Sequence, residues 1–489
     1  MRRSPTVGLL TLGIVVLVAR MAMSAEAVEV GNRRELFVDR RLIELMDETR
    51  LVLHPPQPSG VALRFDNPWE GAFCGYATLM HDGDLYRMYY RGLPHSGADG
   101  SSAEVTCYAE SRDGVHWTKP SLSLFEVDGS RENNVILADA APATHNFCPF
   151  RDPRPDVPAA ERYKAVGGTA KSGLIAFVSS DGIRWQKLQD EPVFRDSGWV
   201  FDSQNVPFWS ASENSYVLYY RKSPEGVRSI ARATSSDFRH WSKPRMMDFG
   251  DTPKEHLYTN QTRPYYRAPQ IYIGVAARFM PGRQVITAEQ AKQIGVDPKY
   301  FGDISDAVLL TTRGGQHYDR TFMESFIRPG LGLENWVSRT NYPALGIMPT
   351  GKDEMSIYVQ KNYGQPTARI DRYTLRPDGF VSVNAPYKGG EMLTRPLVFA
   401  AGKNQDGSPV ELHLNFSTSA AGFVKVELQA ADGQPIAGYA FSDATEMIGD
   451  ELDRVVSWKA GSDLAQLAGK PIRLRLVMKD ADLYAIQFR

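Results

Sequence analysis

Carboxylates recur along the sequence beside amide, imidazole, guanidinium and indole side chains. Five short stretches carry them: "FDNPWEGAFCG" (65–75), "THNFCPFRDPRP" (144–155), "FDSQNVPF" (201–208), "KEHLYTNQTRPYY" (254–266) and "ENWVSRTNYPAL" (334–345). Cleavage of a glycosidic bond needs such a set, because one carboxyl group must donate a proton while another attacks the anomeric carbon or activates water. Amides, arginines and an aromatic face would hold the sugar.

The candidate site residues fall into two groups. The catalytic candidates are Glu70, Asp152, Asp202 and Glu255. The candidate substrate contacts are Asp66, Trp69, His145, Asn146, Asn205, His256, Asn260, Arg339 and Asn341. The competing interpretation is that each acid caps a turn or pairs with a neighbouring arginine.

A second pattern indicates the elements that position these residues. The motif Ser-x-Asp-x-x-x-Trp-x-Lys occurs in "SRDGVHWTKP" (111–120), "SSDGIRWQKL" (179–188) and "SSDFRHWSKP" (235–244), with degenerate copies at 312–320 and 376–380. In each copy we expect a tight turn between two outer strands, a Trp packed on those strands and a solvated Lys. A motif used once per unit is structural rather than catalytic, although a sugar-stacking platform is the alternative.

Upstream of each copy lies a hydrophobic strand, a polar turn and a second strand. These pairs occupy 76–92, 151–168, 205–221, 262–279 and 341–361. One four-stranded unit per copy predicts a five-bladed β-propeller, from about Asp66 to Ala385. Within it, Pro281–Gly302 is expected to form a lid with one short helix.

The end of the chain predicts a second β domain. Alternating strands separated by Asp-Gly and Gly-Lys-Pro turns follow Leu393 and indicate an antiparallel β-sandwich. The sequence therefore predicts an all-β fold, with a five-bladed propeller (61–390) followed by the sandwich (391–489). Residues 28–60 are an N-terminal strand segment that docks on one of the two.

The inner strands of a propeller converge on a central channel, so residues at their starts face one another. We expect Asp152 near the channel floor, where it would hold hydroxyl groups. Glu255 is the preferred proton donor, because His256 and Tyr258 offer a mixed polar and aromatic setting that raises a carboxyl pKa.

Composition bounds the remaining properties. The 489 residues carry a net charge of −1 and no basic stripe, which argues against a nucleic-acid partner. Residues 1–27 are typical of a secretory signal peptide, so we expect a secreted or periplasmic protein with no membrane contact in its mature form. Cys74, Cys107 and Cys148 fit no metal motif and are expected to be buried free thiols. No cofactor is expected, and a structural cation in the channel stays open.

One segment resembles a known family. "FRDPR" (150–154) is similar to the Phe-Arg-Asp-Pro segment of invertase-type glycoside hydrolases (family 32), which belong to a broader group with arabinosidase/xylosidase-type enzymes (family 43). The resemblance implies a five-bladed propeller followed by a sandwich, and it assigns stabilisation of the transition state to Asp152. The family's nucleophile segment, Asn-Asp-Pro-Asn-Gly, and its Glu-Cys-Pro segment are both absent here, so those two roles do not transfer.

The sequence therefore predicts a secreted glycoside hydrolase that uses paired carboxylates on a carbohydrate substrate. The main alternative is a non-catalytic carbohydrate-binding or scaffold propeller. A lyase for uronate-containing glycans, with His145 or His256 and a Tyr as base, is a third class. A sialidase is the weakest option, because the sequence has no clear arginine triad.

Overall fold

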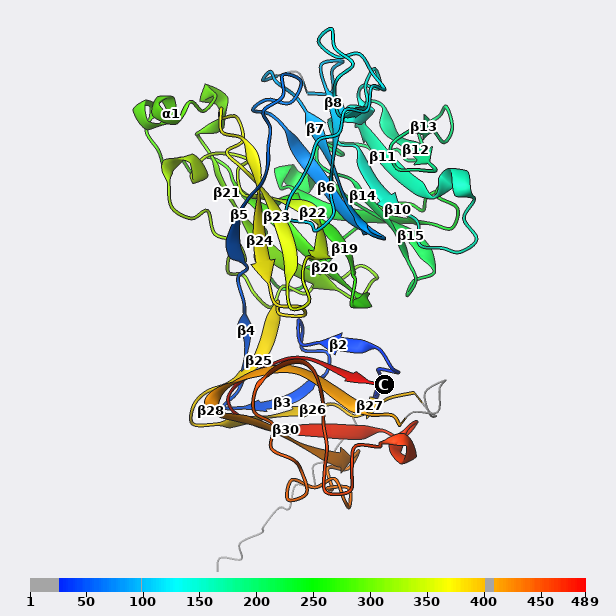
Figure 1. Ribbon diagram of the computed structural model, residues 1–489, viewed down its shortest axis with the longest axis vertical. Coiled ribbons are helices and arrows are strands. Elements are labelled where there is room, and N and C mark those ends of the chain that lie inside the picture. The colour runs from blue at the N-terminus through cyan, green and yellow to red at the C-terminus, as the bar shows by residue number, and fades with distance from the viewer. Residues whose placement is uncertain (1–25, 98, 401–408) are drawn as a thin grey trace, which may run out of the picture.

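The computed structural model describes residues 26–97, 99–400 and 409–489, and almost every regular element in them is a strand (Figure 1). Within these ranges α1 (Ala288–Ile294) is the one α-helix. The predicted all-β class is confirmed. The predicted signal peptide lies almost entirely outside the described residues and stays a prediction. Among the described residues, no helix has the length and apolar character needed to cross a membrane.

The upper part of Figure 1 is built from four-stranded antiparallel units. The first comprises β6 (Gly75–Asp82), β7 (Leu85–Gly92), β8 (Val105–Ser111) and β9 (Val135–Leu137). The second comprises β10 (Cys148–Arg151), β11 (Tyr163–Thr169), β12 (Gly173–Ser179) and β13 (Gln186–Lys187). The third comprises β14 (Val206–Ser210), β15 (Ser215–Lys222), β16 (Ser229–Ser235) and β17 (Arg245–Met246).

Two further units complete this part. In the fourth, β20 (Ala268–Met280) pairs with β18 (His256–Thr259), β19 (Thr262–Tyr265) and β21 (Ile304–Thr312). In the fifth, β22 (Tyr342–Pro349), β23 (Met355–Lys361) and β24 (Arg369–Leu375) are followed outward by β5 (Gln57–Arg64), which comes from the other end of the chain. A single parallel bridge, Leu345 to Thr78, joins the fifth unit to the first in one eight-stranded sheet.

Side chains from successive units meet at the centre of this arrangement. Gln204 Nε2 donates to Thr78 Oγ1 at 2.5 Å and lies 3.6 Å from the sulfur of Cys148. Gln261 Nε2 donates to Gln204 Oε1 at 2.7 Å and to the carbonyl of Pro343 at 2.8 Å. These contacts link all five units, and we interpret the units as the five expected blades around an axis that this polar ring fills.

The repeated motif forms the predicted turn in all three clear copies. Asp113, Asp181 and Asp237 each accept two backbone N–H groups at 2.8 Å through one carboxylate oxygen. The three Trp side chains each donate to the carbonyl three residues earlier at 3.2 Å and pack on hydrophobic clusters. The structural interpretation of the motif is confirmed.

The expectation of a solvated Lys is wrong for the first copy. Lys119 Nζ lies 2.7 Å from carboxylate oxygens of Asp66 and of Glu70, and its side chain is 15% exposed. Lys187 and Lys243, at the same motif position, are exposed as predicted. Among the described residues, the first of the three copies is the one with a buried acid, Glu70, within reach of its Lys ammonium group.

The C-terminal region forms one ten-stranded sheet around a single hydrophobic core (Figure 1). Its long strands are β28 (Leu412–Ala430) and β30 (Ile472–Phe488), both interrupted by bulges where they pair. The shorter strands are β1 (Val28–Glu29), β2 (Arg34–Leu36), β3 (Ile43–Asp47), β4 (Arg50–Leu53), β25 (Val381–Ala385), β26 (Gly390–Thr394), β27 (Leu397–Val398) and β29 (Asp450–Val455). By its strand pairing this region is one continuous curled sheet, and its arrangement as a sandwich stays a prediction.

The boundaries between these regions differ from the predicted ones. The N-terminal strands β1 to β4 belong to the C-terminal sheet, and β25 pairs with β4 and β30. The last blade strand therefore ends at Leu375, before the predicted boundary at residue 390. Trp458 is 3% exposed within the C-terminal core, as expected of a structural residue.

The segment 281–302 contains α1 as its short helix, as predicted. Thr287 caps the helix in a capping box with Gln290, and Gly295 ends it with φ 68°. The segment packs through Ile286 and Tyr300 against Phe73 and Tyr363. Whether it moves as a lid stays a prediction. All three cysteines are buried free thiols, as expected.

Candidate functional site

A small polar pocket opens where the inner strands of the blades begin. Its lining comes from the first, fourth and fifth units and from the loops that precede the second and third: Gly75, Tyr76, Arg91, Asp99, His145, Asp202, Tyr258, Arg339, Tyr342, Gln360 and Tyr363. We call it the central pocket. Its accessible volume is about 20 Å³, room for one small polar group.

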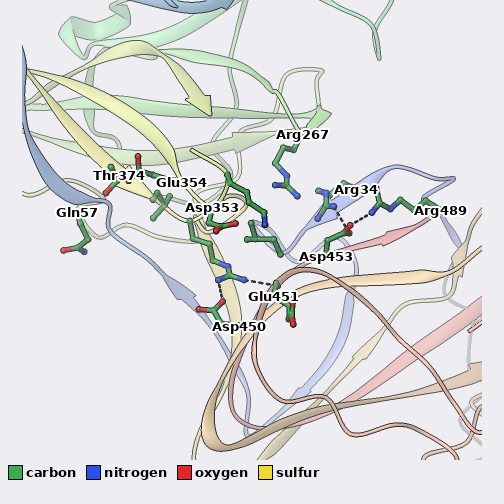
Figure 2. A pocket seen from close by; sticks show the side chains of 14 residues that line it. Arg34, Gln57, Arg267, Asp353, Glu354, Thr374, Asp450, Glu451, Asp453 and Arg489 are labelled. Atoms are coloured by element: carbon green, nitrogen blue, oxygen red, sulfur yellow. Dashed lines mark hydrogen bonds and ion pairs between the residues drawn. The ribbon is translucent and has the colours of Figure 1, made fainter. Parts of the chain in front are cut away.

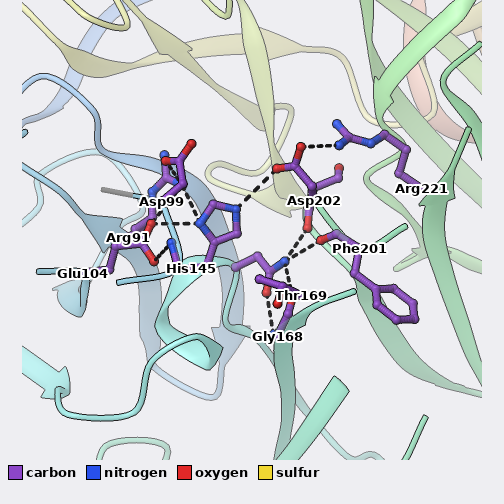
Figure 3. Close-up of polar contacts among 12 residues, drawn as sticks. Arg91, Asp99, Glu104, His145, Gly168, Thr169, Phe201, Asp202 and Arg221 are labelled. Atoms are coloured by element: carbon purple, nitrogen blue, oxygen red, sulfur yellow. Dashed lines mark hydrogen bonds and ion pairs between the residues drawn. The ribbon is translucent and has the colours of Figure 1, made fainter. Parts of the chain in front are cut away.

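A chain of charged side chains crosses this pocket (Figure 3). His145 Nδ1 lies 2.8 Å from Glu104 Oε1, and its Nε2 lies 3.5 Å from Asp202 Oδ1. Asp202 Oδ2 in turn accepts from Arg221 Nη2 at 2.7 Å. Glu104 and His145 are buried, whereas the Asp202 side chain is 45% exposed. Asp202 is therefore a solvent-accessible carboxylate held by two buried partners.

These contacts determine the charge states of Asp202 and His145. Burial raises the pKa of Asp202, but the hydrogen bond from His145 and the charge of Arg221 outweigh burial and hold that pKa well below its usual range. Burial lowers the pKa of His145, but the hydrogen bonds to Asp202 and Glu104 outweigh burial and raise it above its ordinary value. The geometry thus favours an ionised Asp202 beside a protonated His145.

Asn146 and its neighbours position Asp202. The Asn146 side-chain amide donates to the carbonyls of Gly168, Phe201 and Ser203 at 2.7–2.9 Å. Phe201 has φ 63°, so the loop that carries Asp202 is held in a strained turn. Asn205 donates to two of the same carbonyls. Asn146 and Asn205, both predicted as substrate contacts, are therefore buried residues that hold the loop carrying Asp202.

A second set of acids surrounds Arg91. The oxygens of Asp99 and Glu104 and a nitrogen of His145 lie within 4.8 Å of one another, close enough to hold a metal ion. The Arg91 guanidinium already lies among them, 3.5 Å from Glu104, 3.8 Å from Asp99 and 3.1 Å from His145 Nδ1. Because a cationic group already neutralises these acids, the arrangement does not favour a cation there.

Aromatic rings and arginines form the rest of the surroundings of the central pocket. Arg339 lies over the ring of Tyr300 at 4.7 Å and over that of Tyr258 at 5.7 Å. Arg221 lies 4.5 Å from the Tyr258 ring. Asn341 holds the Arg339 loop, donating to the carbonyls of Ser305 and Asn335 at 3.0 Å. Of the predicted substrate contacts, His145 and Arg339 line the central pocket.

The other catalytic candidates lie away from this pocket. Glu70 is fully buried and contacts Lys119, Tyr90 and the backbone of Asn67. Asp152 is also fully buried, bonded to Tyr216 and paired with Lys164 and Arg154. The expectation that Asp152 lies at the channel floor is wrong, because its carboxylate points into an ion-paired cluster between the second and third units.

Glu255 lines a separate cavity of about 700 Å³ with His256, Phe279 and Trp336. Its carboxylate lies 2.9 Å from Arg278 and also pairs with Arg320. The Glu255 carboxylate is therefore held by two guanidinium groups, which the expected mixed setting of His256 and Tyr258 did not include.

The remaining predicted contacts are also outside the central pocket. Asp66 is exposed and paired with Lys119, and Trp69 donates to Asn134 at 2.9 Å. Asn260 is buried and accepts from the backbone of Thr262.

Several pocket residues were absent from the predicted set. Asp99 and Glu104 lie in the loop between β7 and β8, where no strand pattern singles them out. Arg91 and Arg221 did leave a signal, because the tripeptide Tyr-Tyr-Arg ends both β7 and β15. A buried Arg at the end of a central strand needs an acid partner, so this repeat could have identified both residues.

The cavity drawn in Figure 2 lies between the blades and the C-terminal sheet. It has a volume of about 940 Å³, and its charged lining is extensively paired, including Arg376 with Asp450 and Arg489 with Asp453. Figure 2 shows Asp453 between Arg34 and Arg489, with which it forms ion pairs. We interpret this cavity as part of the interface and the central pocket as the candidate site.

Comparisons with known proteins give limited similarity. No protein-family model matches the chain. Over 199 residues the chain is 25% identical to a sucrose-6-phosphate hydrolase of Escherichia coli, a match that covers 40% of this chain and 37% of that protein. The chain thus matches well under half the length of this relative.

Some solved structures are similar to this chain, at low sequence identity. One is a fructofuranosidase from Schwanniomyces occidentalis complexed with fructosylnystose, with 11% identity, coverage of 88% of this chain and 97% of that chain, and a TM-score of 0.38. Another is an N-acetylgalactosamine deacetylase from F. plautii in complex with blood group B trisaccharide, with 12% identity, coverage of 67% and 95%, and a TM-score of 0.44. The sequence match to the sucrose-6-phosphate hydrolase agrees with the predicted resemblance to invertase-type glycoside hydrolases.

Proposed function

We propose that this protein is a glycoside hydrolase and that Asp202 is the anionic catalytic carboxylate of its central pocket. The observation that carries the proposal is the geometry of Asp202. It is the one predicted catalytic acid among the described residues that lines the central pocket, and it is held between His145 and Arg221 while 45% exposed. An accessible carboxylate with a lowered pKa can attack an anomeric carbon or activate water.

The second carboxyl group of the proposal is Asp99. It lines the same pocket and its side chain is 48% exposed, whereas Glu104 is fully buried by Arg91 and His145. His145 acts as a positioning residue, because its contact with Asp202 keeps that carboxylate ionised and oriented. The low pKa of Asp202 suits a base or nucleophile, which leaves proton donation to its partner.

A lyase that uses His145 as its base is less well supported by the same residues. β-Elimination needs a neutral base, and the pKa of His145 is raised by its two carboxylate partners against the opposing effect of burial. Burial also raises the pKa of Tyr76 and Tyr342 well above that of free tyrosine. None of these three groups is set to accept a proton near neutral pH.

The test is hydrolysis of a panel of plant and algal oligosaccharides by the wild type and by the D202N, D99N and E255Q variants. We expect D202N and D99N to lower turnover by about a hundredfold or more, since each removes a reacting carboxyl group. E255Q is the matched control, because Glu255 lines a different cavity, and it should keep wild-type turnover. Wild-type rates in D202N, or loss only in E255Q, would contradict this site.

Two further outcomes separate the alternatives. Binding of an oligosaccharide with no cleavage by the wild type would favour the carbohydrate-binding propeller. Products that carry a new carbon–carbon double bond, seen by ultraviolet absorbance, would favour the lyase.

A further inference from the structure

Four guanidinium nitrogens around Tyr258 are buried and have no hydrogen-bond partner among the described residues. They are Nε of Arg228 and Arg339, and Nε and Nη1 of Arg221. Buried donors of this kind are rare in folded proteins, and a cluster of them indicates that something else accepts their hydrogen bonds. Arg221 is the most deeply placed, with its residue 2% exposed.

The positive charges of this cluster exceed the negative ones. Arg221 pairs with Asp202, and Arg91 pairs with Glu104. Within the described part of the chain, neither Arg228 nor Arg339 has an acidic side chain within ion-pair distance. The polar contact of the Arg228 guanidinium is with the imidazole of His256 at 3.4 Å. Two cations are therefore left without a counter-charge beside the pocket, at a cost in desolvation that a bound anion would offset.

Aromatic rings hold these two arginines in place. Arg228 lies 4.7 Å from the rings of Trp199 and of Phe279, and 5.3 Å from that of Tyr258. Arg339 lies over Tyr300, and its backbone has φ 58°, a strained value for a non-glycine residue. Rigid guanidinium planes of this kind match the two oxygens of a carboxylate or the oxygens of a sulfate ester.

We propose that the central pocket recognises a negatively charged group on the sugar, so that the substrate class is acidic glycans. The proposal rests on the function given above. Arg339 lines the central pocket together with Asp99 and Asp202, so an anionic group bound by Arg339 would lie in the same pocket as the proposed catalytic carboxylates. Arg228 itself lies 5.3 Å from the ring of Tyr258, which lines the central pocket, and so adds positive charge at its edge.

The test is calorimetric titration of the wild type with di-galacturonate, with a sulfated disaccharide and with a neutral disaccharide. We expect the acidic sugars to bind at least about tenfold more tightly than the neutral one, with an affinity that falls as salt is added. Comparing the titration with di-galacturonate and the titration with the sulfated disaccharide shows whether the site prefers a carboxylate or a sulfate. No preference for acid, including no binding of either acidic sugar up to its solubility limit, would overturn the proposal.

Substitutions of single arginines test which residue causes the preference for acidic sugars. R339M should weaken binding of the acidic sugar about tenfold or more and leave the neutral sugar unchanged, and R339K should restore part of the affinity. R154M is the matched control, because Arg154 also stacks on aromatic rings, Trp209 and Tyr216, but is paired with Asp152 outside the pocket. Equal weakening of both sugars by R339M would show a structural role and overturn the assignment. If R339M does not fold, as judged by circular dichroism, R228M provides the same comparison.

The two proposals fail separately. Tight binding of acidic sugars without cleavage of any glycan would preserve the anion site and reject the hydrolase. Cleavage of neutral glycans that depends on Asp202, with no preference for acidic sugars, would keep the hydrolase and reject the anion site.

Discussion

Two aspartates of similar sequence context end in opposite environments. Asp152 follows an Arg at the end of β10 and is fully buried, with its carboxylate bonded to Tyr216 and Lys164. Asp202 precedes β14 and keeps 45% of its side chain exposed in the central pocket. Burial with a complete set of partners serves stability, whereas partial exposure leaves a carboxylate free to meet a substrate.

The first prediction follows from the buried pair of Asp152 and Lys164. The D152N variant should lose roughly 3 kcal/mol or more of the free energy of unfolding, because it leaves the Lys164 ammonium buried without its counter-charge. Turnover per folded molecule should stay at the wild-type level. Denaturant unfolding at neutral pH, with turnover measured on the same samples, checks both parts.

The pH dependence of this loss has a defined sign. Burial raises the pKa of Asp152, but the hydrogen bond from Tyr216 and the charge of Lys164 outweigh burial and lower it. A lowered folded-state pKa means that the stabilisation is fully present above the unfolded-state pKa of about 3.9 and is lost as the pH falls through the folded-state value. The gap between wild type and D152N should therefore close in acid. A D152N variant as stable as the wild type, with greatly lowered turnover, would return Asp152 to the list of catalytic residues.

At the scale of elements, one turn motif is used three times with the same hydrogen bonds but with different surroundings. The hydrogen bonds made by the Asp and Trp of each copy lie within the motif itself, so those bonds repeat. The Lys reaches beyond the motif, and only Lys119 finds an acid, Glu70, with no exposed side-chain surface. A repeated sequence thus gives a repeated local structure and unequal tertiary contacts.

The second prediction compares the three lysines at one motif position. K119M should lower the free energy of unfolding by roughly 2–3 kcal/mol, because the buried Glu70 carboxylate loses its cation. K187M and K243M should change it by less than about 0.5 kcal/mol, since both side chains are exposed. Urea unfolding of the three variants measures the contrast. Equal effects in all three would mean that the Lys119 ion pair contributes nothing measurable.

At the scale of the whole molecule, the two ends of the chain hold both regions together. β5 completes the fifth blade by pairing with β24, and the N-terminal strands β2, β3 and β4 pair with strands of the C-terminal sheet. Ion pairs cross the junction, including Arg34 with Asp378 at 3.1 Å and Arg313 with Glu35 at 2.6 Å. Neither region is a continuous stretch of sequence.

The third prediction concerns the C-terminal region as a separate fragment. A fragment of residues 393–489 should not fold alone, because it lacks β1 to β4, β25 and most of β26, and so exposes an edge of β30 and part of the core. Its circular dichroism and amide proton spectra should be those of an unfolded chain, with the full chain as the control. A cooperative thermal transition in the fragment would show that β28, β29 and β30 are sufficient.

Local patterns in the sequence determined the all-β class, the paired strands and the Asp-based turns, because alternation and turn chemistry act over a few neighbouring residues. They also identified Asp202, His145 and Arg339 as site candidates. Only the tertiary structure decided that Glu104 and His145, 41 residues apart, share a hydrogen bond, and that Glu70, Asp152 and Glu255 are held by cations elsewhere. The reason is physical: the charge and role of an acid depend on its burial and on which side chains surround it, and those neighbours come from loops whose meeting no local pattern specifies.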